Sequence, residues 1–253
     1  MIYKFPTANK RCKLVLNIYS NQPRQIFIVG FDETKRDTEY FKRIMPVEQG
    51  VNTYEFNLPL SPPKLTVIIF DLATGFQKKP STYKVVKFYQ TKLPKLNFHY
   101  DDKTKEFIKL NNYVSKKAGH LKANMVYHDP KRYFKMIYYP KIEGGFTPAR
   151  IHKTENYIEI SQDSFRKLTV PNRWLINAHE YSHNYINRDR DNEDQADANG
   201  MELYLMQGFP YIEGFYTFER ILHDTESNEE RKEFVYNFLM KHRLENWQGA
   251  ELW

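Results

Sequence analysis

Two histidines and a glutamate stand close enough in the sequence to share one chemical task. They belong to the segment His179-Glu180-Tyr181-Ser182-His183, which has the pattern H-E-x-x-H. If the segment is helical, the histidines lie at positions i and i+4 and project from one face, one turn apart. Two imidazoles placed in this way can bind one zinc ion at about 2.0–2.1 Å each. Glu180 would then lie beside the open side of the metal, where it can take a proton from water.

The residues before this segment predict that a helix carries it. Pro171 suits the first turn of a helix, and Thr169 or Asn172 can cap its N-terminus. The apolar residues that follow give the predicted helix a half-buried character. A zinc site needs this support, because ligands on exposed and flexible side chains would not be preorganised.

The third metal ligand has to come from elsewhere, because a catalytic zinc takes three protein ligands and keeps one position open. Asp189 lies six residues after the second histidine, but the turn that would bring it back has Ile186 where a glycine is needed. Glu193 opens a second predicted helix, 193–206, in which Asp197 follows one turn later on the same face. We therefore favour Glu193 and keep Asp189 as the alternative. Asp197 can accept a hydrogen bond from a ligand histidine and so fix the orientation of its ring.

Small residues of the second predicted helix indicate how it packs. Ala196 and Gly200 leave room for this helix to approach the first one closely. The connecting residues 187–192 are polar and favour turns, so the chain can reverse its direction there.

The combined pattern, His179-Glu180-x-x-His183 followed by Glu193-x-x-Ala196-Asp197, resembles the gluzincin branch of zinc metallopeptidases. This resemblance covers about 30 residues, and the gap between the two helices is short for the family. It implies a zinc ion bound by His179, His183 and Glu193. It also implies that Glu180 acts as general base and acid, and that Asp197 supports a ligand histidine.

Members of that family usually add a tyrosine or histidine that stabilises the oxyanion. No motif assigns this role in the chain. Four residues are candidates by location alone, and each of them also fits a structural role: Tyr204, Tyr211, Tyr216 and His223.

The amino-acid composition argues against several classes of protein and of binding site. The 253 residues are 41% hydrophobic and 16% aromatic, which can bury a sizeable core and argues against disorder. The formal net charge is +7, but the basic residues are scattered in pairs, so a nucleic-acid partner is not expected. The single cysteine, Cys12, excludes an intrachain disulfide and a cysteine-based zinc site. We find no signal-peptide pattern and no apolar run that could span a membrane, and we expect a cytoplasmic location in the producing cell or a place in a virion.

Residues 1–93 read as an all-β domain. Alternating or apolar runs at 12–19, 25–29, 52–58, 64–71 and 83–90 are separated by turn signals. Short strands with such spacing predict a β-sandwich-like domain, for which we expect a docking role.

Residues 94–253 combine helices and strands, so the chain as a whole is predicted to be α+β. We expect a helix from 101 to 119, strands at 133–139 and 156–160 with a turn at Gly144-Gly145 between them, and a short helix at 161–168. Two further helices are predicted at 215–223 and around 227–239. The resemblance implies a zincin-like domain in which a strand before the zinc helix forms the edge of the cleft, and 156–160 is the predicted edge.

These observations favour a zinc-dependent metallopeptidase that acts on a protein or peptide substrate. Other interpretations stay open. The histidines can be ordinary helix residues beside a solvated acidic loop, or the metal can be purely structural. The added β domain, the missing signal peptide and the Lys-, Asn- and Tyr-rich composition together also look similar to virion proteins of crAss-like tailed phages. A portal-neck or ring protein that carries a peptidase-like domain is therefore the alternative, and its partners would be copies of itself or other virion proteins bound through the β domain.

Overall fold

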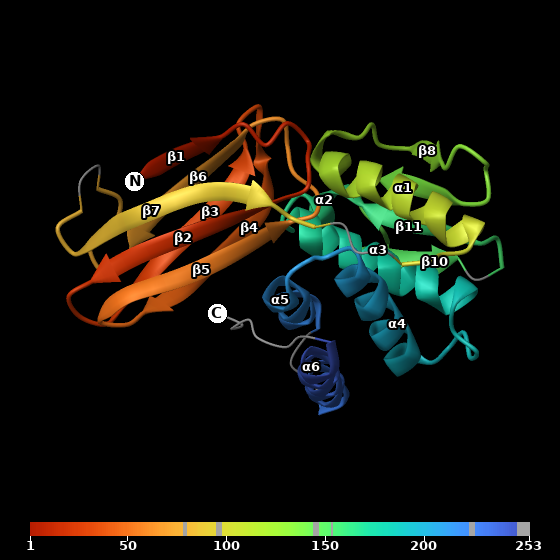
Figure 1. Cartoon of the computed structure of the whole chain (residues 1–253). Coiled ribbons are helices and arrows are strands. Elements are labelled where there is room, and N and C mark those ends of the chain that lie inside the picture. Colours follow the sequence, from red (N-terminus) through yellow and green to blue (C-terminus); the bar gives the residue numbers. More distant parts are fainter. Residues whose placement is uncertain (78–79, 95–97, 144–146, 153, 223–225, 247–253) are drawn as a thin grey trace. The chain divides into compact units, whose positions relative to one another are not determined.

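The structure is a computed structural model, and it describes residues 1–77, 80–94, 98–143, 147–152, 154–222 and 226–246. The predicted mixture of helices and strands is confirmed (Figure 1). The chain divides into two compact units, Met1–Lys95 and Leu96–Leu252. The predicted Gly144-Gly145 turn and His223 lie outside the described residues.

The N-terminal unit is built from two antiparallel sheets, with strand orders β1-β6-β3-β4 and β5-β2-β7. Its strands are β1 (Ile2–Phe5), β2 (Cys12–Ser20), β3 (Arg24–Asp32), β4 (Lys35–Val47), β5 (Gly50–Leu58), β6 (Leu65–Asp71) and β7 (Tyr83–Lys92).

Alternation of side chains along the strands creates the core of this unit. In β2, Leu14, Leu16 and Ile18 point to one face and are fully buried. The two sheets meet where Phe41 of β4 stacks on Phe56 of β5, with ring centroids 4.6 Å apart. The alternating pattern in the sequence therefore identified β2, which contributes the most buried apolar residues to this core.

Sequence analysis missed β1 and β4, which lie at the two edges of one sheet. In β4, buried residues such as Tyr40 and Phe41 are interrupted by exposed charged residues such as Lys42. Charged residues are common on edge strands because they discourage pairing with other chains. The register with β3 also shifts near Gly30, which breaks the regular period of two that a strand prediction needs.

The C-terminal unit combines a sheet with several helices. The sheet has the order β10-β11-β9-β8, in which β9 and β11 are parallel and the other pairs are antiparallel. The elements are α1 (Asp102–Lys117), η1 (Ala118–His120), β8 (Met125–His128), β9 (Lys135–Tyr139), β10 (Ala149–His152), β11 (Tyr157–Ser161), α2 (Gln162–Phe165), α3 (Val170–Tyr185), α4 (Glu193–Met206), α5 (Tyr211–Ile221) and α6 (Glu226–Asn246).

The predicted edge of the cleft was wrong. The strand predicted at 156–160 is β11, and it lies inside the sheet between β10 and β9. The edge strand is β10, which contacts α3. Sequence analysis missed β10 because it has only four residues, Ala149–His152, too few to show a clear alternation.

Helix α3 carries the H-E-x-x-H segment. Its N-terminus is capped, and its back, which is the face opposite the histidines, packs against α1. Thr169 caps the N-terminus in a capping box with Asn172, and Pro171 lies in the first turn, as predicted. On the back of the helix, the ring of Tyr181 stacks on Phe107 of α1 with centroids 3.9 Å apart. The side chain of Asn111 in α1 also donates a hydrogen bond to the carbonyl oxygen of Trp174 in α3, over 3.0 Å. These contacts fix the rotation of α3 and therefore the direction in which its histidines point.

Helix α4 packs directly against α3, and the two lie side by side in Figure 1. Asn192 caps its N-terminus by accepting a hydrogen bond from the backbone N–H of Gln195. The prediction that small residues allow a close approach is confirmed. A Cβ atom on Gly200 would lie 2.8 Å from the backbone nitrogen of His179 and 2.9 Å from its Cα. Only a residue without a side chain fits at this point.

We expect Gly200→Ala to lower the free energy of unfolding by about 1–3 kcal/mol, because the added methyl group would meet backbone atoms that cannot move away. Gly214→Ala in α5 is the matched control. Its Cβ would meet the Sδ atom of Met201 at 3.0 Å, and this side chain can adjust. Both substitutions gain similar helix propensity. Urea unfolding of the two variants measures the difference, and a Gly200→Ala protein as stable as the control would contradict the prediction.

Candidate metal centre

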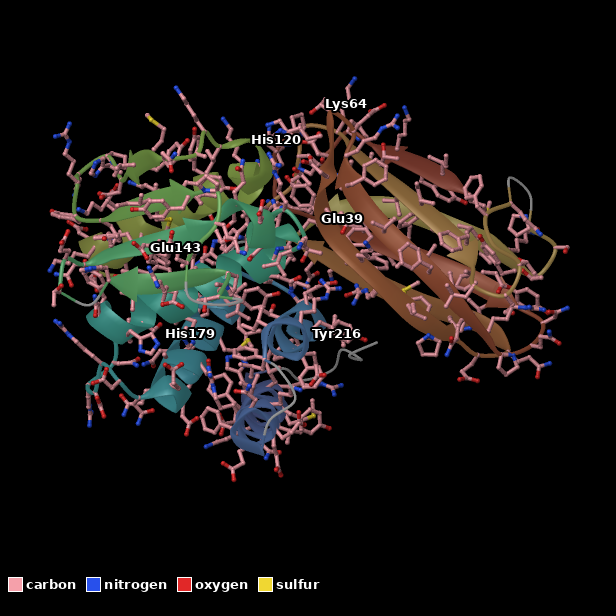
Figure 2. The ribbon with its side chains drawn as sticks, turned by 180° about the vertical axis from the view of Figure 1, so that it is seen from behind. Glu39, Lys64, His120, Glu143, His179 and Tyr216 are labelled. Atoms are coloured by element: carbon pink, nitrogen blue, oxygen red, sulfur yellow. The ribbon has the colours of Figure 1, made fainter. Side chains whose placement is uncertain are left out.

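Helices α3 and α4 bring three potential metal ligands to one point. The Nε2 atoms of His179 and His183 lie 3.1 Å apart, and both rings project from the same face of α3 (His179 is labelled in Figure 2). Glu193, the first residue of α4, places its Oε2 atom 3.3 Å from His179 Nε2 and its Oε1 atom 3.6 Å from His183 Nε2. Among the residues that the structure describes, these three form the one cluster whose donor atoms could hold a metal ion.

The second nitrogen of each imidazole is also engaged, and this determines the tautomers. Nδ1 of His183 lies 2.8 Å from the backbone carbonyl oxygen of Arg190, which can only accept a hydrogen bond. Nδ1 of His179 lies 2.7 Å from Oδ1 of the fully buried Asp197. Each Nδ1 therefore carries a hydrogen, and in the neutral rings both Nε2 atoms present lone pairs. Two lone pairs that face each other beside a carboxylate need a cation between them.

The three donor residues lie close enough together to share one zinc ion. Ligands bound at about 2.0–2.1 Å in tetrahedral geometry lie about 3.3 Å from one another. The distance of 3.1 Å between the two Nε2 atoms is close to this value, and the Glu193 carboxylate approaches His179 with one oxygen (3.3 Å) and His183 with the other (3.6 Å). With one donor atom from each residue, the three atoms lie within 4.8 Å of one another. Two imidazoles and one carboxylate are also a donor set that zinc accepts. The residues present therefore fit the metal that the sequence predicts.

Arg231 of α6 is a member of the site that sequence analysis missed. Its Nε and Nη2 atoms donate to the two carboxylate oxygens of Asp197 over 2.9 and 3.0 Å. Nη2 also lies 3.2 Å from Oε2 of Glu193. One guanidinium therefore holds the supporting carboxylate and the third candidate ligand together. No sequence signal marks this residue among the 38 lysines and arginines of the chain.

The charges of these groups shift their proton affinities. Burial by itself would lower the pKa of His179, but the hydrogen bonds to Asp197 and Glu193 and the nearby carboxylates raise this pKa to about 10. The hydrogen bond to His179 lowers the pKa of Glu193 to about 2, although burial opposes this shift. Without a metal, a proton on His179 therefore supplies the positive charge that the cluster requires.

Glu180 follows His179 in α3, and its carboxyl group contacts the edge strand β10. Burial raises the pKa of this carboxyl group to about 7, against the opposing effects of His179 and of a hydrogen bond from the protein backbone. That bond comes from the N–H of Ile151 in the edge strand β10, which lies 2.7 Å from Oε2 of Glu180. A group with a pKa near neutrality can both accept and release a proton at physiological pH.

The cluster lies in a cavity of about 470 Å³. Its walls are formed by α3, the edge strand β10 with the two residues before it, the C-terminal half of α5, and Arg231. The cavity has the size of a small-molecule or peptide side-chain site rather than of a packing defect. His179, Glu180, His183, Glu193 and Asp197 all lie along it.

Other predicted candidates lie elsewhere. Asp189 is exposed and accepts a hydrogen bond from the backbone N–H of Asp191, so the structure does not bring it to the histidines. Tyr204 donates to the carbonyl of Pro210 and Tyr211 contacts His242.

None of the tyrosines proposed as oxyanion stabilisers lies along this cavity, and this includes Tyr216, which is labelled in Figure 2. Two arginines line the described part of the cavity, and both are ion-paired: Arg150 with Glu159, and Arg231 with Asp197 and Glu193.

Comparison of the chain with protein-family models, with curated proteins and with solved structures finds no match. Among the described helices, none is both long and apolar enough to cross a lipid bilayer. The assignment of the site therefore depends on its own geometry.

We expect the zinc content of the purified protein to depend on Glu193 and not on Asp189. Elemental analysis of the metal-replete wild type should give about one zinc per chain, and His183→Ala and Glu193→Ala should remove it. Asp197→Asn should weaken zinc binding by about 10–100-fold, because the ligand ring loses its supporting carboxylate. Asp189→Asn is the matched control and should keep the metal. Retention of zinc by Glu193→Ala together with its loss in Asp189→Asn would reverse the assignment.

We expect the metal-free protein to lose stability as the pH rises from 7.5 to 9.5. The pKa of His179 is about 10 in the folded state and 6.5 in an unfolded chain, so the proton on His179 stabilises the folded state fully below pH 6.5. This contribution is lost as the pH rises through 10. Urea unfolding of the metal-free wild type and of His179→Gln at both pH values measures it. Equal pH dependence in the two proteins would contradict the prediction.

Proposed function

We propose that this chain is a zinc-dependent metallopeptidase, with a zincin-like C-terminal unit and a β-sandwich-like N-terminal unit. The observation that carries the proposal is the convergence of two His Nε2 lone pairs and one carboxylate within 4.8 Å of one another, next to the half-buried Glu180. The H-E-x-x-H pattern and its resemblance to gluzincins also support the proposal, because they point to the same residues.

His179, His183 and Glu193 would hold the metal. When bound at such a site, zinc acts as a Lewis acid that polarises a carbonyl group and lowers the pKa of water. The protein contributes the fixed orientation of these three side chains. Asp197 and the Arg190 carbonyl hold the two rings, and Arg231 restrains Glu193.

Glu180 would move the proton of the reaction. Hydrolysis of a peptide bond forms a carbon–oxygen bond with water and breaks the carbon–nitrogen bond. The carboxylate of Glu180 takes a proton from the attacking water and gives it to the leaving amine. The hydrogen bond from the Ile151 N–H keeps this carboxylate beside the cluster, and the raised pKa suits both transfers.

The edge strand β10 would align an extended peptide. Because Ile151 directs its N–H to Glu180 and not to β11, the backbone groups of Ala149 face the same outer side of the sheet. An extended chain can add to such an edge by main-chain hydrogen bonds. The edge lies along the same cavity as the candidate metal ligands, so a peptide bound there would pass the metal.

We expect Glu180→Gln to abolish peptide hydrolysis without removing the metal. The substitution keeps the size of the side chain and an oxygen for the Ile151 N–H, but the amide cannot accept the proton. The rate of cleavage of a fluorogenic peptide mixture by the zinc-loaded protein should fall by about 10²–10⁴-fold. Zinc content, measured in parallel, should stay unchanged.

The exposed residue Glu155 offers the matched control, and Glu155→Gln should cleave the mixture at the wild-type rate. A Glu180→Gln protein that is as active as the wild type would rule out this role for Glu180. Zinc-loaded wild type that cleaves no peptide in the mixture would contradict the proposed function as a whole.

A further inference from the structure

The solvent-facing side of helix α1 carries a row of lysines around one tyrosine. The opposite side of the helix is buried, and Phe107 on that side stacks on Tyr181 of α3. Because an α-helix has 3.6 residues per turn, the row that faces away from α3 comprises Lys105, Lys109, Tyr113, Lys116 and Lys117. These five residues do not line the cavity of the candidate metal ligands.

Strand β8 and the loops on either side of it extend this surface, and β8 lies beside α1 in Figure 1. The ring centroid of Tyr127 in β8 is 6.3 Å from that of Tyr113. The backbone N–H of Lys122 donates to the Tyr127 hydroxyl over 3.0 Å, and the hydroxyl donates to the Lys122 carbonyl over 3.2 Å. Beyond β8, Nζ of Lys131 lies 3.4 Å from Oδ2 of Asp102 at the start of α1.

These contacts join the segments into one surface, which we call the lysine–tyrosine face. Its members are Lys105, Lys109, Tyr113, Lys116, Lys117, Lys122, Tyr127 and Lys131. The six lysines lie beside two carboxylates, Asp102, which pairs with Lys105 and Lys131, and Glu106, which pairs with Lys109. The formal charge of this group is therefore +4, more than half of the net charge of +7 of the chain. Folding thus gathers basic residues that are scattered in the sequence, and such a surface attracts polyanions.

The two tyrosines give the face a second property. Tyr113 is 44% exposed, and its ring lies at 43° to that of Tyr127. Nζ of Lys117 is 4.7 Å from the centroid of the Tyr113 ring, so positive charge and aromatic surface occupy the same place. An acidic peptide would contact the lysines but gain little from the rings. A nucleic-acid base can stack on such a ring while its phosphate contacts a neighbouring lysine.

The arrangement favours a single strand over a duplex. In a duplex the bases stack on one another, so their faces are not available to Tyr113 or Tyr127. The row of α1 from Lys105 to Lys117 is about 18 Å long, which is enough to follow several nucleotides of an extended backbone. Lysines on both sides of the tyrosines can contact phosphates while the rings hold the bases between them.

We infer that the lysine–tyrosine face binds single-stranded nucleic acid, with its lysines on the phosphates and Tyr113 and Tyr127 as stacking platforms for bases. Contacts of this kind carry little sequence preference, because every base has a face on which to stack. The inference does not depend on the proposed peptidase function, since the face and the metal-site cavity share no residue.

Fluorescence anisotropy of labelled strands of about 20 nucleotides, titrated with the whole protein, tests the inference. We expect oligo-dT and oligo-U both to bind at about 50 mM salt, and the tighter of the two identifies DNA or RNA as the preferred ligand. A DNA strand of the same length with abasic sites throughout keeps the phosphates but lacks the bases. It should bind about tenfold or more weakly than oligo-dT, and so should a duplex of that length.

Removal of one ring should weaken stacking alone. Tyr113→Leu keeps an apolar residue that favours a helix, so it should weaken binding of oligo-dT about tenfold and leave binding of the abasic strand unchanged. Tyr236→Leu is the matched control, because Tyr236 is a tyrosine of α6 that is 49% exposed and lies outside the face. It should leave both affinities unchanged.

Removal of two charges should change the salt dependence. Each phosphate contact on a single strand contributes about 0.7 to the slope of log K against log salt concentration, so Lys116→Gln with Lys117→Gln should reduce this slope by about 1.4. Lys84→Gln with Lys92→Gln removes the same charge from exposed positions of β7 and should leave the slope unchanged.

Three results would overturn the inference. The first is no binding of oligo-dT or oligo-U at low salt. The second is equal affinity for oligo-dT and the abasic strand together with no effect of Tyr113→Leu, which would show a surface that attracts any polyanion. The third is binding of polyglutamate as tight as that of oligo-dT, which would indicate an acidic protein as the partner.

Discussion

The close contact between α3 and α4 at Gly200 is the constraint on which the candidate metal centre depends. The backbone of α4 approaches the backbone of His179 so closely that a Cβ atom would not fit. This approach places Asp197, one turn earlier in α4, within hydrogen-bond distance of the His179 ring. It also places Glu193, at the start of α4, beside both histidines. A helix held farther away would leave the two imidazoles without either carboxylate.

The charges of the site form a balanced set only when a cation is present. Glu193 and Asp197 are held by Arg231, whose single positive charge faces two carboxylates. The two imidazole lone pairs add further negative potential at the same point. In the metal-free protein, a proton on His179 supplies the positive charge that balances the carboxylates. The hydrogen bonds to Asp197 and Glu193 therefore raise the pKa of this half-buried histidine. A metal ion would replace that proton and keep the same contacts.

The two sides of α3 serve different purposes. Its back is packed with aromatic rings, such as Tyr181 on Phe107, and with hydrogen bonds to α1, so the helix cannot rotate without loss of these contacts. Its front borders the cavity and carries, turn by turn, apolar residues, then His179 and Glu180, then His183. The contacts with α1 therefore hold the helix in one orientation, and this fixes the positions of the apolar residues, the histidines and Glu180 along the cavity.

The sequence by itself determined what lies on one face of one helix. The positions of His179 and His183 follow from the helical repeat, the Thr169 cap follows from local hydrogen bonding, and the Glu193–Asp197 pair follows from the same period in the next helix. Alternation, which has a fixed period of two, also predicted strands β2, β3, β5, β6 and β7 of the N-terminal unit, but not β1 or β4. These are local properties, set by bond geometry within a few residues.

Only the tertiary structure decided which distant segments complete the site. Arg231 lies 34 residues from Asp197 in the chain, and nothing near it in sequence distinguishes it from other basic residues. The edge strand β10, which has only four residues, was also missed. The roles of Arg231 and β10 come from contacts between distant segments, and such contacts depend on the shape and volume of the whole unit, which no local pattern encodes.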